Sequence, residues 1–291
     1  MFPYNEDLET ARARNIEDAL REDIGRCDFT ALLVPNAPAS AILKVRESAV
    51  LCGRDWFEGC FRRLDPAVTV NWDYAEGDLM QANSQVCQVS GRSRALLTGE
   101  RPALNFLQLL SATATAARRH RQAIEGASPN PRGCQVLDTR KTIPGLRQAQ
   151  KYAVRVGGGF NQRFALWDGI LIKENHIAAA GGIAPALRAA RALHAGVSIQ
   201  IEVESLDELR QALDAGAESI LLDNFALDAM REAVEIAQQH AGGLRPPALL
   251  EASGGLGLED LRAVAGTGVD RISVGRLTKD VQAVDFSLRI I

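Results

Sequence analysis

The chain has 291 residues, of which 46% are hydrophobic and 24% charged, a composition typical of a folded protein with one large α/β domain or a barrel and a smaller domain. The formal net charge of -3 at pH 7 argues against a nucleic-acid-binding surface, and no apolar run approaches the roughly 18 residues of a membrane-spanning helix. The five scattered cysteines form no CxxC pair and the N-terminus is acidic and polar, so we expect a cytoplasmic protein with reduced thiols that binds neither nucleic acid nor membrane.

The first ~100 residues are predicted to form a small α+β layered structure. Apolar residues at helical spacing over residues 5–24 place Ile16, Leu20 and Ile24 on one face of a helix. A second helix is expected at residues 55–64. The strands predicted around it are residues 41–47, 68–74 and 85–90.

The C-terminal residues 284–290 alternate strictly between apolar and polar side chains. Such alternation indicates a half-buried strand. We expect this strand to return to the N-terminal sheet, because the other strands predicted in the second half of the chain are uniformly apolar.

A long helix is expected to begin at Pro102, because proline is favoured in the first helical turn. Its buried stripe would contain Leu104, Leu107, Leu110 and Ala114. This helix leads from the N-terminal layers into the second half of the chain.

Six apolar, β-branched runs follow, and helical segments separate them. Alternation of strand and helix about every 20–35 residues is typical of a (β/α) barrel, and six strands favour a reduced or open barrel over a full one of eight. The strands are predicted at residues 134–138, 169–173, 197–203, 219–223, 248–252 and 270–274. The helices are predicted at residues 148–156, 183–194, 206–215 and 226–239.

Cationic residues follow the first of these strands. Arg140 and Lys141 come after one run, Lys173 ends the next, and Arg163 lies between the two runs. Charged groups at the ends of buried parallel strands are costly unless they face a cleft and bind an anion. Arginine and lysine suit carboxylates and phosphates, although an isolated one is more often a solvated surface group.

Carboxylates and glycine-containing turns follow the later strands. Glu202 and Asp223 could hold magnesium or accept hydrogen bonds from sugar hydroxyls, although Glu202 could equally pair with a neighbouring lysine. The turn at residues 253–255 and Gly275 would let backbone amides approach a phosphate. His176 fits a helix start better than a catalytic role. Together these features indicate a phosphorylated substrate bound with magnesium.

Several ordered motifs carry a resemblance to a known family. They are LDTRKTIPGLR (137–147), YAVRVGGG (152–159), LWDGILIKENHI (166–177), IEVES (201–205), LLDNF (221–225), EASGGL (251–256) and SVGRLTKD (273–280). ALREDIGRCDFT (19–30) and LLTGERPALNFLQLLS (96–111) extend the likeness toward the N-terminus. The sequence resembles quinolinate phosphoribosyltransferase, also called nicotinate-nucleotide pyrophosphorylase (carboxylating), almost end to end.

The resemblance implies an α/β fold in which an N-terminal α/β sandwich joins an incomplete, seven-stranded (β/α) barrel. We therefore predict the sandwich at residues 1–111, completed by the C-terminal strand within residues 277–291, and the barrel at residues 112–276. The family uses magnesium and works as a homodimer or a higher assembly of dimers. It converts quinolinate and phosphoribosyl pyrophosphate to nicotinate mononucleotide, pyrophosphate and carbon dioxide in NAD biosynthesis.

The resemblance also implies roles for individual residues. Lys141, Lys173, Glu202 and Asp223 would be catalytic, the two carboxylates would hold magnesium directly or through the substrate, and Arg101 would reach the neighbouring subunit's site. The residues assigned to substrate binding are Arg101, Thr139, Arg140, Lys141, Gln162, Arg163, Lys173, Glu202, Asp223, Ser253, Gly254, Gly255, Val274, Gly275 and Arg276.

One departure and two competing hypotheses remain. The family usually reads Asn-His-Arg where this chain has Asn161-Gln162-Arg163, and glutamine can donate a hydrogen bond to a carboxylate but cannot become cationic. The competing hypotheses are a related phosphoribosyltransferase with another acceptor, such as nicotinate, and a barrel that binds sugar phosphates without catalysis. The LIKENH tract and Arg101 favour quinolinate, and the intact strand-end charges argue against a non-catalytic barrel.

Overall fold

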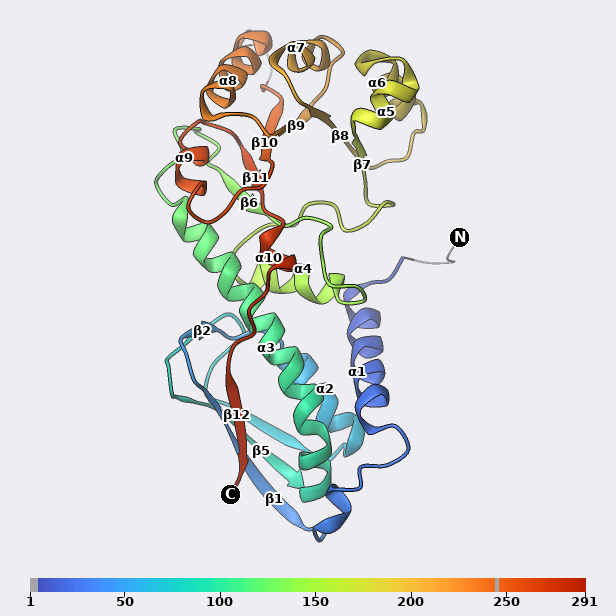
Figure 1. Ribbon diagram of the computed structural model, residues 1–291, viewed down its shortest axis with the longest axis vertical. Coiled ribbons are helices and arrows are strands. Elements are labelled where there is room, and N and C mark those ends of the chain that lie inside the picture. The colour runs from blue at the N-terminus through green and yellow to red at the C-terminus, as the bar shows by residue number, and fades with distance from the viewer. Residues whose placement is uncertain (1–4, 244–245) are drawn as a thin grey trace. The chain divides into compact units, whose positions relative to one another are not determined.

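The computed structural model describes residues 5–243 and 246–291, which divide between two compact units (Figure 1). Of these residues, the first unit contains those within Met1–Arg118, Thr142–Gly158 and Leu277–Ile291, and the second those within Arg119–Lys141 and Gly159–Arg276. The predicted domain boundaries differ from these divisions at two places, the first being residues 112–118, which fall in the first unit. The segment Thr142–Gly158 packs with the first unit, although the sequence prediction assigned it to the barrel.

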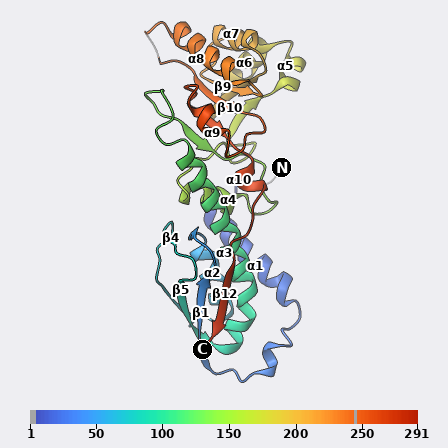
Figure 2. The ribbon, with the colours of Figure 1, turned by 60° about the vertical axis from the view of Figure 1, so that its left-hand side comes forward.

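The first unit is built on an antiparallel sheet in the order β12-β1-β5-β3 (Figure 2). β12 pairs with β1 in a register that sets Phe286 opposite Val45, so the predicted return of the C-terminal strand is confirmed. The strands are β1 (Pro38–Val45), β3 (Thr69–Trp72), β5 (Gln85–Arg92) and β12 (Phe286–Ile290), with a separate pair of two-residue strands, β2 (Ala49–Val50) and β4 (Leu79–Met80).

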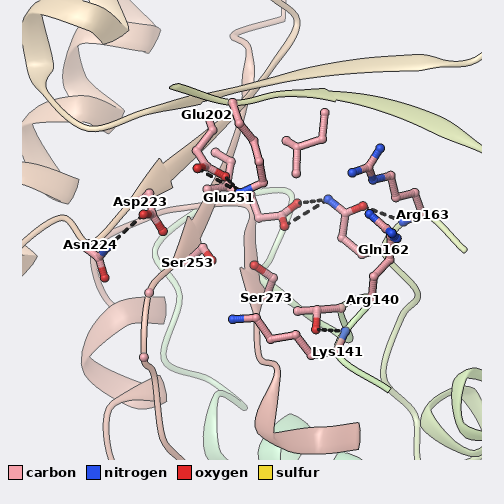
Figure 3. A pocket seen from close by; sticks show the side chains of 16 residues that line it. Arg140, Lys141, Gln162, Arg163, Glu202, Asp223, Asn224, Glu251, Ser253 and Ser273 are labelled. Carbon is pink, nitrogen blue, oxygen red and sulfur yellow. Dashed lines mark hydrogen bonds and ion pairs between the residues drawn. The ribbon is translucent and has the colours of Figure 1, made fainter. Parts of the chain in front are cut away.

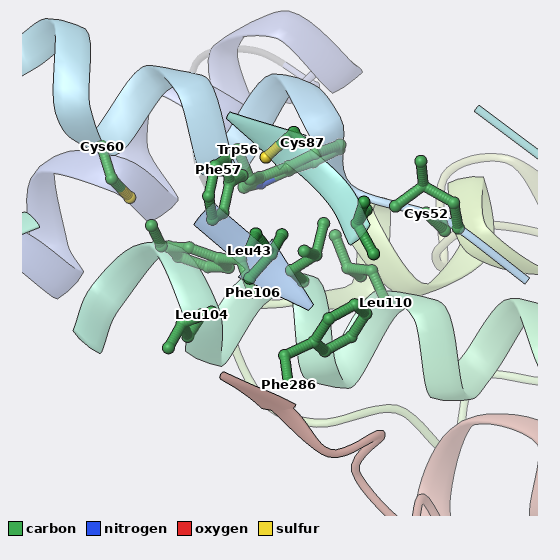
Figure 4. Packing of buried hydrophobic residues seen from close by; sticks show 14 of the residues in the cluster. Leu43, Cys52, Trp56, Phe57, Cys60, Cys87, Leu104, Phe106, Leu110 and Phe286 are labelled. Atoms are coloured by element: carbon green, nitrogen blue, oxygen red, sulfur yellow. The ribbon is translucent and has the colours of Figure 1, made fainter. Parts of the chain in front are cut away.

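Helices cover this sheet and enclose one hydrophobic core (Figure 4). Trp56 and Phe57 on α2, Leu43 on β1, Leu110 on α3 and Phe286 on β12 all belong to it. Because these side chains are buried, the periodic and alternating apolar patterns of the sequence correctly predicted helices and strands here. The helical segments are α1 (Leu8–Ile24), the short 3-10 turn η1 (Ala31–Leu33), α2 (Arg54–Leu64), α4 (Arg147–Val156) and the first part of α3 (Ser93–Ala123).

Helix α3 begins at Ser93 and contains Pro102 in its interior, so the predicted start at Pro102 is wrong. An interior proline removes one backbone hydrogen bond and costs about 3 kcal/mol. Tertiary packing offsets this cost, because Leu96 is buried and a Cβ on Gly99 would lie 2.7 Å from the Phe61 ring. The turns before the proline thus lie directly against α2.

The second unit is built on a parallel sheet in the order β6-β11-β10-β9-β8-β7, and all six predicted strands are confirmed. No helix in the described part of the chain is both long enough and apolar enough to cross a membrane. The strands are β6 (Gln135–Leu137), β7 (Gly169–Ile172), β8 (Ser198–Val203), β9 (Ser219–Asp223), β10 (Leu249–Ser253) and β11 (Arg271–Ser273). The helices of this unit are α5 (Glu174–Ala180), α6 (Ile183–Ala192), α7 (Leu206–Asp214), α8 (Leu227–Ala241) and α9 (Leu261–Ala265). The short helix α10 (Arg276–Lys279) begins at the last residue of this unit and otherwise belongs to the first.

The barrel is open between β6 and β7, the two edges of this sheet. Phe160 forms a single parallel bridge to Leu137 and donates its N–H to the Val136 carbonyl at 2.9 Å, on the edge of β6 that β11 leaves free. The resemblance implied seven strands, whereas the described residues form six. The Phe160 bridge stands where a seventh strand would lie in chain order, between β6 and β7.

Gly157 marks a close approach of α4 to α3, because a Cβ there would lie 2.3 Å from the Ala114 carbonyl oxygen. Gly157→Ala should therefore lower the free energy of unfolding by roughly 1–3 kcal/mol through overpacking. Gly266→Ala is a matched control, since both glycines end helices with φ near -69° and -66° and the nearest atom at Gly266 is 3.3 Å away. Equal denaturant midpoints for the two variants would contradict the close contact.

Candidate active site

A pocket of about 550 Å³ lies in the second unit, at the carboxyl ends of its parallel strands (Figure 3). Eleven predicted site residues line it: Thr139, Arg140, Lys141, Gln162, Arg163, Lys173, Glu202, Asp223, Ser253, Gly254 and Gly255. The other lining residues are Leu171, Leu221, Asn224, Glu251 and Ser273, which the sequence prediction did not assign to the site.

Four predicted site residues are not among the described residues that line the pocket. Gly275 lies beside it, because a Cβ on this glycine would be 3.1 Å from Lys141 Cδ. Val274 is buried in the barrel, Arg276 is exposed at the start of α10, and Arg101 is exposed on α3 in the first unit. Their roles in substrate binding stay predictions.

Strand register explains why side chains from distant segments meet in this pocket. Glu202 on β8 pairs with Leu221 on β9, which in turn pairs with Glu251 on β10. One level higher, Asp223 pairs with Ser253. Because alternate residues of a strand point to the same face, both levels face the pocket.

Lys173 and Glu202 form the central ion pair of the pocket. Lys173 Nζ donates to both carboxylate oxygens of Glu202, at 2.8 and 3.1 Å, and its side chain is 45% exposed whereas that of Glu202 is only 8% exposed. Burial raises the pKa of Glu202, the bond from Lys173 offsets part of this rise, and repulsion from Asp223 adds to it. The alternative that Glu202 pairs with a lysine is thus confirmed, with a lysine that itself lines the pocket.

Arg140 and Arg163 place two positive charges close together on the side of the pocket formed by β6 and the segment after it. Burial lowers the pKa of Arg163, and repulsion from Arg140 lowers it further. Arg163 Nη1 donates to the Gly169 carbonyl oxygen at 2.8 Å, which anchors the guanidinium at the start of β7. Two guanidinium groups held against their mutual repulsion are well suited to a ligand with two carboxylates.

Asn224 is a pocket residue that the sequence prediction missed. Its backbone is left-handed, with φ of 56°, and its N–H donates to the Ser253 carbonyl oxygen at 3.0 Å. Its side-chain Nδ2 donates to Asp223 Oδ2 at 2.8 Å. The same side chain lies so close to Gly254 that a Cβ on that glycine would be only 2.2 Å from Asn224 Oδ1. Asparagine tolerates this conformation better than most residues, which is the one local signal that could have identified it.

Glu202 and Asp223 are the residues that would hold a magnesium ion together with a phosphorylated substrate. Glu202 and Asp223 are near enough for Asp223 to raise the pKa of Glu202, so a divalent cation between them would relieve repulsion. No cluster of three or more potential ligands occurs among the described residues. Magnesium typically keeps several waters and binds through one or two carboxylates plus phosphate oxygens, which agrees with two carboxylates alone.

His176 has a structural role, as its sequence context indicated. Its Nδ1 accepts the backbone N–H of Lys173 at 3.0 Å, and the Lys173 carbonyl oxygen accepts the N–H of His176 at 2.8 Å. These bonds tie the first turn of α5 to the end of β7. The histidine thus fixes the backbone from which the Lys173 side chain extends.

Comparison with known proteins identifies relatives over nearly the whole chain. Two family models match, described as the quinolinate phosphoribosyl transferase N-terminal domain at residues 28–111 and C-terminal domain at residues 113–289. The probable nicotinate-nucleotide pyrophosphorylase [carboxylating] of Bacillus subtilis is 39% identical over 272 residues, which cover 92% of this chain and 90% of the relative. The human nicotinate-nucleotide pyrophosphorylase [carboxylating] is 36% identical over 276 residues, which cover 94% of this chain and 90% of the relative. The solved nicotinate-nucleotide pyrophosphorylase of Francisella tularensis has a TM-score of 0.91 and 40% identity, covering 99% of this chain and all of that one.

Replacing Glu202 by glutamine should separate stability from activity. Because burial raises the pKa of Glu202, the ionised carboxylate destabilises the folded chain, and its contribution to stability falls as pH rises above about 4.5 until the folded-state pKa is passed. At pH 7.5 we expect Glu202→Gln to melt at or above the wild-type temperature while its turnover falls by about 10²-fold or more.

Glu232→Gln is the control, because Glu232 is an exposed partner of Arg210 at 3.3 Å and such surface pairs contribute little to stability. A Glu202→Gln variant that melts several degrees below both wild type and this control would contradict the claim that the ionised Glu202 carboxylate destabilises the folded chain. A variant that retains wild-type turnover would contradict the catalytic assignment of Glu202.

Proposed function

The chain belongs to the quinolinate phosphoribosyltransferase family, and we propose that it transfers the phosphoribosyl group of phosphoribosyl pyrophosphate to quinolinate. The products are nicotinate mononucleotide, pyrophosphate and carbon dioxide, and the reaction belongs to NAD biosynthesis. The enzyme is thus a pentosyltransferase, a carboxylating nicotinate-nucleotide pyrophosphorylase. We place it in the cytoplasm, in keeping with five cysteines that are all free thiols.

The observation that carries this proposal is the division of charge within one pocket. Figure 3 shows Arg140 and Arg163 on one side and Asp223 on the other. Gly254 and Gly255 also line the pocket, and Gly254 lies against Asn224, the residue after Asp223. The arginines suit the two carboxylates of quinolinate, and the glycines let backbone amides approach a phosphate. Lys173 also lines the pocket and is bonded to Glu202.

The first chemical step joins the two substrates. Quinolinate is a dianion and phosphoribosyl pyrophosphate carries more negative charge, so the cations must overcome the repulsion between them before reaction. Once both are held, the encounter becomes effectively intramolecular. The pyridine nitrogen forms a bond to the anomeric carbon of ribose while the bond from that carbon to the pyrophosphate oxygen breaks.

Charge shifts during this step, and the strand-end residues are placed to stabilise it. Positive charge develops on the sugar ring, and the carboxylates of Glu202 and Asp223 favour it. Negative charge grows on the departing pyrophosphate, where Lys141 and Lys173 would bind it. Magnesium held near the two carboxylates, directly or through the substrate, would neutralise further charge on the phosphates.

The second step removes carbon dioxide. With its nitrogen bonded to ribose, the pyridinium ring accepts the electron pair of the breaking carbon–carboxylate bond, and the same ring carbon then takes a proton. No enzyme nucleophile is required. The pocket contributes orientation and exclusion of water, with Leu171 and Leu221 as its apolar lining.

A turnover assay tests the proposal against its competitors. Purified protein with phosphoribosyl pyrophosphate, magnesium and quinolinate should release carbon dioxide and form nicotinate mononucleotide in equal amounts. Reaction with nicotinate alone would indicate a related transferase with another acceptor. Binding of phosphoribosyl pyrophosphate without reaction of any acceptor would indicate a non-catalytic barrel.

Single substitutions should weaken one substrate at a time. Arg140→Ala should raise the KM for quinolinate by about tenfold or more, because a charge-assisted hydrogen bond to a carboxylate is lost. Asp223→Ala should act mainly on the KM for phosphoribosyl pyrophosphate. Arg231→Ala and Asp228→Ala are matched controls on the exposed face of α8. An unchanged quinolinate KM in Arg140→Ala would remove Arg140 from its role.

We also propose that the enzyme is a homodimer or a higher assembly of dimers, and that Arg101 reaches the site of the neighbouring subunit. The family resemblance and the exposure of Arg101 on α3 support this. Mixing inactive Arg101→Ala chains with inactive Lys173→Ala chains should restore part of the activity, because one site of each mixed dimer keeps both residues. Mixed dimers of verified composition that stay inactive would argue against sharing.

A further inference from the structure

A network of polar side chains, two of them buried, adjoins Arg163 at the pocket. Glu251 on β10 is completely buried, and Gln200 on β8 is 6% exposed. Gln200 Nε2 donates to Glu251 Oε2 at 3.0 Å and to Ser219 Oγ at 3.2 Å. A buried carboxylate is costly unless polar groups bond to it, and here neutral amides do so.

Gln162 connects this network to the arginine beside it (Figure 3). Its Nε2 donates to Gln200 Oε1 at 2.7 Å and faces both oxygens of Glu251, at 3.3 and 3.4 Å. Its Oε1 accepts the backbone N–H of Arg163 at 2.5 Å, and its own N–H donates to Asp138 Oδ1 at 3.0 Å.

These contacts allow only one orientation of the Gln162 amide. Turning it over would set its oxygen against the Glu251 carboxylate and its NH2 group against the N–H of Arg163. Both new contacts would be repulsive, so the network fixes which end faces which partner. An amide offers a donor and an acceptor at every pH, and this site uses both.

We propose that Gln162, Gln200 and Glu251 are positioning residues that hold Arg163 for the acceptor carboxylate, and that Gln162 acts through Arg163 instead of binding the acceptor itself. This inference rests on the proposed function. Gln200 gives the clearest test of this inference, because Gln200 is not among the described residues that line the pocket. Any effect of Gln200 on acceptor binding must therefore pass through its neighbours.

A double-mutant cycle tests the inference. Gln162→Met, Gln200→Met and the double variant keep an unbranched side chain of similar length but remove the amide. Each single variant should raise the quinolinate KM and its directly titrated Kd on the order of tenfold, with the KM for phosphoribosyl pyrophosphate within about twofold of wild type. The double variant should resemble either single one, because both interrupt the same chain of hydrogen bonds.

Glu251→Gln is a second variant that distinguishes positioning from simple charge. Removing a negative charge near a dianion would lower the quinolinate KM if Glu251 acted only through its field. Positioning predicts a higher KM, because a neutral amide accepts weaker bonds from Gln162 and Gln200 and no longer fixes their orientation. A lowered KM in this variant would overturn the proposal.

Thr267→Val is the control for lost buried polarity, since Thr267 is buried in the same unit, donates to the Val264 carbonyl oxygen at 2.7 Å and lies outside the pocket. A Gln200→Met enzyme with the quinolinate KM of this control would overturn the inference while leaving the proposed function intact. So would effects of the Gln162 and Gln200 variants that multiply independently. A wild-type enzyme that fails to use quinolinate would overturn both.

Discussion

The structure depends on holding like charges together at one end of an open barrel. Burial lowers the pKa of Arg163 and raises that of Glu202, and repulsion from Arg140 and from Asp223 adds to these shifts, although the bond from Lys173 offsets part of the rise at Glu202. A ligand of opposite charge would relieve the repulsion on each side of the pocket. Parallel strands make this possible, because their carboxyl ends meet at one edge and their backbone hydrogen bonds fix the side chains in place. Lys173 forms an ion pair with Glu202, which adds a cation to the side that carries the carboxylates.

The supporting contacts are as specific as the charged groups themselves. Asn224 ties Asp223 to the turn at Gly254, and Gln162 ties Arg163 to buried residues of two other strands. A charged side chain on a loop would otherwise lose much of its rotamer freedom on binding a ligand, which weakens the interaction. Positioning before the substrate arrives lets more of the binding energy act on the reaction.

Features encoded locally could be predicted from the sequence, and features encoded by distant contacts could not. Six barrel strands and the returning C-terminal strand were predicted because their apolar and alternating patterns reflect burial directly. The predicted start of α3 at Pro102 was wrong, because the packing of Gly99 against α2 outweighs the preference of proline for a first helical turn. Eleven pocket residues were found at strand ends and by resemblance, but Glu251 bonds to a residue 89 positions away, and no local pattern marks such a pair.

The most direct test of this account is a calorimetric titration of the enzyme with quinolinate and, separately, with nicotinate. If paired arginines are held together to receive two carboxylates, the dicarboxylate should bind on the order of tenfold or more tightly than the monocarboxylate, as expected for one additional charge-assisted contact. Equal affinities for the two acids would contradict the account, because the repulsion stored on the arginine side would then have no function in recognition.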